Sequence, residues 1–111
     1  MRPEIPAIES IRHVHLVAIC GTAMGSLACM LVDRGFRVTG SDTDAYPPMS
    51  DQLRAAGIEV QKGFAPEHVL SDRPDLVVIG NAVRRENPEA RAAIDAGLPY
   101  VSFCDAIHHF F

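Results

Sequence analysis

The chain has 111 residues, of which 48% are apolar, and carries a formal net charge of −4 with Lys62 as its only lysine. These values fit one globular domain and exclude the broad Lys- and Arg-rich surface that nucleic-acid binding needs. No apolar run approaches the roughly 20 residues needed to span a bilayer, and three cysteines without CxxC spacing favour neither a disulfide framework nor a zinc site.

The N-terminal region, residues 1–12, is predicted to be a flexible or loosely docked arm. It contains two prolines and no apolar segment of the kind found in a signal peptide. Together with the unpaired cysteines, this favours a cytoplasmic location. The apolar run 14–19 follows and predicts a buried strand, which ends at Cys20-Gly21-Thr22. Apolar residues on a helical period then predict a helix over 23–34.

A helix–glycine–strand junction recurs three times along the chain. Gly35, Gly57 and Gly97 each precede a short predicted strand, at 37–40, 58–61 and 100–101. Glycine at these places is typical of a helix that ends and returns to a sheet. Alternation of strands and helices in so short a chain predicts an α/β fold, a Rossmann-like three-layer domain with a mostly parallel sheet of about five strands.

The remaining elements carry their own start signals. Ser50 is predicted to cap a helix over 50–56, and Asn87 followed by Pro88 predicts a helix over 87–96. The continuous apolar run 75–79 predicts a central strand covered on both faces. Ser102 or Asp105 opens a last helix over 103–110. The apolar end of the chain, which could favour dimerisation, is expected to be exposed: Ile107, Phe110 and Phe111.

Ligands of parallel α/β sheets bind at the carboxyl ends of the strands. The first such end here leads into Gly21–Gly25, at the start of a helix, where free N–H groups and the helix dipole attract phosphate. Gly21 is expected to permit a tight turn and Gly25 to allow close helix–strand packing. Ala18, Cys20 and Ala23 stand where a dinucleotide loop prefers glycine, so the alternative is a turn that binds nothing.

The next two strand ends carry polar residues. Asp42 lies 21 positions after Gly21, the spacing at which an acid accepts from a ribose hydroxyl, although it could equally cap a turn. Asn81 and Ala82 follow the central strand, where a small residue and an amide suit a ligand or an ordinary turn. The five histidines show no metal-ligand spacing. No nucleophile pattern or phosphate-binding lysine motif is present, so neither catalytic residues, metal nor cofactor are expected in this chain.

Four stretches resemble the start of the Mur ligases, the ATP-dependent amino-acid and peptide ligases of peptidoglycan synthesis. They are His15–Ala28, Val38–Asp42, Val77–Val83 and Glu86–Glu89. The resemblance implies that residues 13–111 form an N-terminal domain that binds UDP-N-acetylmuramate. It also implies a central ATPase domain that uses ATP and Mg, and a C-terminal domain for the incoming amino acid or peptide. Neither of these two is in this chain, so ligase activity is not expected from it alone.

The resemblance also implies a role for each matching residue. Gly21, Thr22, Ala23, Met24 and Gly25 should face the diphosphate, with Ser41 and Asp42 near the uridine. Asn81 and Ala82 should line the same crevice, and Tyr46, in the segment Tyr46–Ser50, should close over the uracil.

Within the family, Cys20–Ala28 and Tyr46–Ser50 are most similar to the ligase that attaches the tripeptide L-Ala-γ-D-Glu-meso-diaminopimelate in peptidoglycan recycling. The alternatives are the member that adds L-alanine, an NAD(P)-binding Rossmann domain, and an α/β module without a ligand. The oligomeric state is left open.

Overall fold

The computed structural model describes residues 5–80 and 83–111. It contains a five-stranded sheet in the order β3-β2-β1-β4-β5, in which every neighbouring pair is parallel. The strands are β1 (His13–Val17), β2 (Arg37–Asp42), β3 (Glu59–Lys62), β4 (Leu76–Ile79) and β5 (Tyr100–Ser102). The predicted fold class is confirmed, with a sheet that is wholly rather than mostly parallel.

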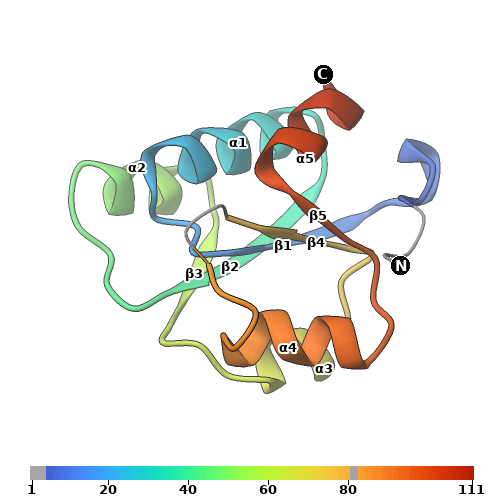
Figure 1. The fold of residues 1–111 in the computed structure, drawn as a ribbon. Coiled ribbons are helices and arrows are strands. Elements are labelled where there is room, and N and C mark those ends of the chain that lie inside the picture. The colour runs from blue at the N-terminus through green and yellow to red at the C-terminus, as the bar shows by residue number, and fades with distance from the viewer. Residues whose placement is uncertain (1–4, 81–82) are drawn as a thin grey trace.

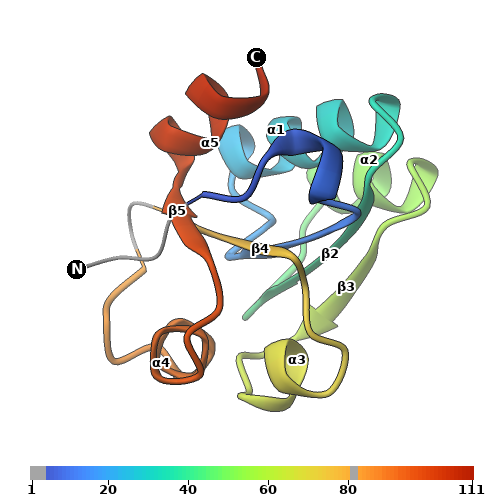
Figure 2. The same cartoon turned by 90° about the vertical axis from the view of Figure 1, so that its right-hand side faces the viewer.

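Helices cover both faces of this sheet, so the domain has three layers (Figures 1 and 2). One face carries α1 (Thr22–Asp33), α2 (Met49–Ala55) and α5 (Phe103–Phe110). The other carries α3 (Glu67–Leu70) and α4 (Pro88–Asp95). A short 3-10 helix, Ile8–Ser10, precedes β1. None of the helices in the described ranges is long and apolar enough to cross a membrane.

The two layers between sheet and helices differ in composition. All five residues of β1 are buried, and alternate side chains point to opposite faces. Val14 and Leu16 join a large apolar cluster with α1, α2 and α5. On the α3/α4 side, Val17 belongs to a much smaller apolar cluster. His13 and His15 are buried polar side chains that alternate along β1 with Val14 and Leu16. The layer between the sheet and the helices α3 and α4 is therefore partly polar.

The predicted helix ends and caps are largely confirmed. Gly35, Gly57 and Gly97 have positive φ values of 93°, 79° and 73° at the ends of α1, α2 and α4. The side chain of Asn87 accepts hydrogen bonds from the backbone N–H groups of the first turn of α4. Ser102 caps α5 in the same way. Local steric and hydrogen-bonding rules therefore operate here as the sequence indicates.

Two element boundaries were predicted wrongly, and one short helix was not predicted. α2 begins at Met49 after Pro48, and no side chain caps it, so Ser50 lies inside the helix rather than at its start. β1 ends at Val17, not at residue 19, because Ala18 turns the chain with a φ of 68°. The four-residue helix α3 was not predicted, since one helical turn is too short to show an apolar period.

The two ends of the described chain are packed more closely than expected. Phe110 is only 6% exposed, and its ring makes an edge contact with Phe36, their centroids 5.1 Å apart. The expectation of an exposed apolar end is therefore wrong for Phe110 because α5 lies on the sheet. Ile107 is half-buried, and only Phe111 is exposed. In the predicted arm, Ile11 is buried in the core.

Candidate functional site

The ends of β1 and β2 meet at the carboxyl edge of the sheet, where Val17 pairs with Ser41. The backbone carbonyl of Ser41 accepts hydrogen bonds from the N–H groups of Ala18 and Ile19, at 2.8 and 3.1 Å. Asp42 Oδ2 accepts a third from the N–H of Cys20, at 3.0 Å. We call residues 18–21 the loop. The backbone N–H groups of its first three residues all donate hydrogen bonds to the end of β2.

Ile19 anchors the loop in the large core. Its side chain is fully buried and lies over Gly40 of β2. A Cβ atom at Gly40 would stand 2.5 Å from Ile19 Cδ1 and 2.7 Å from Ile19 Cβ. Gly40 is therefore needed for this close approach, although the sequence did not mark it out as such.

The N-terminus of α1 follows the loop and is open to solvent. Gly21 is its N-cap, and the described residues show no side-chain cap for this helix. Gly21, Thr22 and Ala23 are exposed. The N–H groups of the first turn, with the positive end of the helix dipole, can bind an anion.

Glycine at position 21 is not required by the turn. Gly21 has φ −63° and ψ 149°, which any residue adopts. A Cβ there would meet nothing nearer than 3.9 Å. The expectation that Gly21 permits the turn is wrong, because the positive φ falls on Ala18 instead.

The other two predicted phosphate-loop residues are buried. Met24 is 6% exposed and belongs to the core. Gly25 lies against α2, where a Cβ would approach within 2.2 Å of Met49 Sδ. Its close packing is thus between helices, not between helix and strand as expected. Since the N–H of Gly25 already donates to Gly21 O at 2.7 Å, only the part of α1 before it is available to a ligand.

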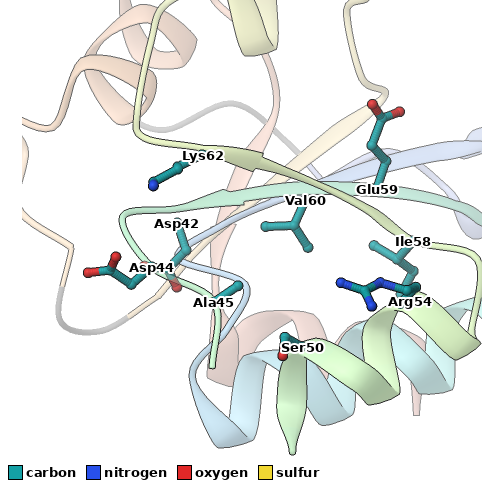
Figure 3. A pocket seen from close by; sticks show the side chains of 9 residues that line it. All are labelled: Asp42, Asp44, Ala45, Ser50, Arg54, Ile58, Glu59, Val60 and Lys62. Carbon is teal, nitrogen blue, oxygen red and sulfur yellow. The ribbon is translucent and has the colours of Figure 1, made fainter. Parts of the chain in front are cut away.

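Asp42 sits beside the loop at the mouth of a pocket. Its Oδ1 accepts the N–H of Thr43 at 2.8 Å and the hydroxyl of the same residue at 3.5 Å, whereas its Oδ2 accepts the N–H of Cys20 and keeps a further lone pair. The pocket has a volume of about 490 Å³ and contains both acidic and basic side chains. Figure 3 shows Asp42, Asp44 and Lys62 grouped at the strand ends, with Arg54 farther along the pocket.

The other predicted site residues lie in different environments. Ser41 is fully buried, and its hydroxyl donates to the carboxylate of Glu89, so its side chain is not available to a ligand. Tyr46 is 69% exposed between β2 and α2. Asn81 and Ala82 lie outside the described residues.

The loop has no nucleophile of the usual kind. Burial and the neighbouring Asp42 carboxylate raise the pKa of the Cys20 thiol, which keeps it protonated. Within residues 5–80 and 83–111, no group of three or more His, Cys, Asp or Glu side chains could hold a metal ion.

A buried carboxylate that the sequence reasoning missed lies behind the site. Glu89 is fully buried and contacts both His15 and His68. The sequence does contain a signal for it: an acid in the first turn after Asn87-Pro88, in a chain with two alternate histidines in an apolar strand.

Comparison with known proteins gives a consistent result. The family model described as "Mur ligase family, catalytic domain" matches residues 13–111. The chain is 44% identical over 97 residues to the UDP-N-acetylmuramate--L-alanyl-gamma-D-glutamyl-meso-2,6-diaminoheptandioate ligase of Escherichia coli (strain K12), covering 87% of this chain and 21% of that protein. It is 34% identical over 100 residues to the UDP-N-acetylmuramate--L-alanine ligase of Lactobacillus acidophilus, covering 90% and 23% respectively.

A solved structure agrees with these relatives. The crystal structure of a murein peptide ligase from Psychrobacter arcticus 273-4 matches with a TM-score of 0.85 and 42% identity, covering 89% of this chain and 20% of that one. The chain thus spans about a fifth of the length of the relatives it matches.

Proposed function

The chain belongs to the Mur ligase family, and we propose that it is the part of such a ligase that binds UDP-N-acetylmuramate. The observation that carries the proposal is the uncapped N-terminus of α1 next to the Asp42 pocket, at one edge of the sheet. A nucleoside diphosphate needs both an anion site and a polar pocket beside it. The family relationship disfavours the alternatives of an NAD(P)-binding domain and a module without a ligand.

The ligand can be assigned to this edge in parts. The diphosphate belongs at Gly21, Thr22 and Ala23, whose backbone is exposed at the helix N-terminus. The uridine belongs toward Asp42, one strand away, and neighbouring strands lie about 4.8 Å apart, which fits the step from diphosphate to ribose. The pocket lining has three acids, Asp42, Asp44 and Glu59, against two basic residues, Arg54 and Lys62, so its net negative charge disfavours a phosphate there. We expect the exposed side chain of Tyr46, between β2 and α2, to close over the base.

In the whole ligase the share of this chain is to position the substrate. ATP and Mg would act in the central domain, where they would activate the lactyl carboxylate for attack by the incoming amine. By holding the diphosphate, at a distance from the lactyl carboxylate, this chain would fix the position and orientation in which the carboxylate meets the reacting groups. Together with the central and C-terminal domains, the chain would work in the cytoplasm.

The incoming group is proposed to be the tripeptide L-Ala-γ-D-Glu-meso-diaminopimelate. Two relatives named for that reaction are 40% and 44% identical, against 34% to 38% for relatives named for L-alanine. Because the incoming group is expected to be read outside this chain, the L-alanine ligase remains the second candidate.

The proposal is tested by following amide shifts of the ¹⁵N-labelled chain during titration with UDP-N-acetylmuramate, UDP and NAD. We expect UDP-N-acetylmuramate and UDP each to shift the amide signals of Thr22 and Ala23 and those around Asp42. The variant Asp42→Asn keeps an oxygen for the Cys20 N–H but loses the charge, and should weaken binding about tenfold, as loss of a charge-assisted hydrogen bond does.

Asp51→Asn is the matched control, since Asp51 is exposed on α2 and does not line the pocket. Its affinity should equal that of the wild type. Shifts caused by NAD but not by the uridine compounds would refute the proposal, as would equal loss of binding in the two variants.

A further inference from the structure

Glu89 is the centre of a buried hydrogen-bond network on the α3/α4 side of the sheet. It lies in the first turn of α4 and is fully buried. Oε1 accepts from the hydroxyl of Ser41 on β2 and from Nε2 of His15 on β1, the latter at 2.8 Å. Oε2 accepts from Nδ1 of His68 on α3 at 2.6 Å and from the N–H of Ala65 at 3.1 Å. One carboxylate therefore connects α4 to β1, to β2 and to the segment around α3.

The donors behind His15 are also aligned toward Glu89. Thr39 Oγ1 lies 2.8 Å from His15 Nδ1 and 2.7 Å from His13 Nε2. If neutral His15 donates from Nε2, its Nδ1 accepts the hydroxyl proton of Thr39, whose oxygen then accepts from His13. His13 Nδ1 is buried without a hydrogen-bond partner among the described residues, which fits a bare lone pair.

The charges of the network are consistent with this direction. Burial disfavours ionised Glu89, but the hydrogen bonds from His15, Ser41 and His68 outweigh it and hold the pKa of Glu89 below its usual value. Burial, with Arg37 nearby, lowers the pKa of His13 and keeps that ring neutral. An ionised carboxylate can only accept hydrogen bonds, so every proton in the network points toward it.

Ser41 links this network to the loop at the carboxyl edge of the sheet. Its hydroxyl is held by Glu89, while its carbonyl holds the N–H groups of Ala18 and Ile19. The next residue, Asp42, holds Cys20. The end of β2 thus holds the loop by hydrogen bonds, and Glu89 of α4 in turn holds the end of β2.

We propose that Glu89 is a positioning residue for the candidate ligand site: by holding Ser41 it fixes the end of β2 and thereby the loop before α1. Glu89 itself touches no ligand. The effect of Glu89 on the loop is independent of the proposed function. Only the effect of Glu89 on affinity for UDP-N-acetylmuramate rests on that function.

Amide hydrogen exchange in the full chain without ligand tests the effect on the loop. In Glu89→Gln, two of the four donors would face an amide NH₂ group instead of an oxygen. We expect the protection of the Ala18 and Ile19 amides to fall about tenfold more than that of Leu27 and Leu31 in the middle of α1, the ratio that corresponds to loss of one hydrogen bond.

Two further variants separate positioning from general destabilisation. Ser41→Ala removes only the link and should reproduce the selective loss at the loop, which also covers the case in which Glu89→Gln fails to fold. Asp75→Asn is the matched control. That carboxylate accepts the N–H groups of Arg12 and His13, at 2.8 and 2.9 Å, at the opposite edge of the sheet. It should lower protection evenly, without singling out the loop.

Affinity for UDP-N-acetylmuramate is the second readout. It should fall in Glu89→Gln and Ser41→Ala and stay within about twofold of the wild type in Asp75→Asn, measured where all variants are folded. An even loss of protection in Ser41→Ala would overturn the positioning role. Failure of the wild type to bind the ligand would instead count against the proposed function and leave the exchange result standing.

Discussion

Replacing Ala18 by glycine should stabilise this protein, although the same change is normally destabilising. Ala18 has a φ of 68°, in the left-handed region. That conformation costs an L-residue about 1–2 kcal/mol, whereas glycine adopts it freely. Against this, glycine loses about 0.5–1 kcal/mol more conformational entropy on folding than alanine does. We therefore expect Ala18→Gly to raise the free energy of unfolding by about 0.5–1 kcal/mol.

Urea unfolding measures the effect as a higher midpoint at an unchanged slope. With a slope of about 1–1.5 kcal/mol/M for a domain of this size, the midpoint should rise by about 0.5 M. Ala92→Gly is the matched control, because Ala92 is also half-buried but lies inside α4. It should lose about 1 kcal/mol. If the two variants lose stability alike, the backbone of Ala18 is not strained and the reasoning fails.

Three other predictions follow from the same geometry. Gly40→Ala should destabilise the chain by about 1–3 kcal/mol, because the new Cβ would clash with Ile19. Gly21→Ala should lower the free energy of unfolding by less than about 1 kcal/mol. Thermal melts of the two variants compare these effects directly. Asn87→Ala removes the cap of α4 and should lower the free energy of unfolding by about 1 kcal/mol, which urea titration would detect. Finally, the pKa of Glu89 is lower in the folded state than its ordinary value of 4.5. The stability it contributes is therefore present above pH 4.5 and lost as the pH falls through the folded pKa, so the midpoints of wild type and Glu89→Gln should converge in acid. A constant gap between them down to full acid unfolding would contradict the assignment of an ionised carboxylate.

The candidate site could be predicted only in part. Parallel strands bring their carboxyl ends to one edge, so the nearness of Gly21 and Asp42 followed from the order of elements. The order of elements does not determine whether a side chain at that edge faces a ligand or the core. Gly25 is buried against Met49 of α2, Ser41 against Glu89 of α4, and Met24 over Gly80 after β4, and those contacts join segments far apart in the chain.

What the sequence determined by itself is local. Gly35, Gly57 and Gly97 end their helices because only residues nearby in the chain decide where a positive φ is needed, and Asn87 caps α4 for the same reason. Only the tertiary structure decided the rest. The left-handed turn falls on Ala18 rather than on a glycine because the end of β2 holds the loop in place. Glu89 becomes a hub because β1, β2 and α3 bring their donors to it, and no short-range pattern encodes a meeting of residues 74 positions apart, as His15 and Glu89 are.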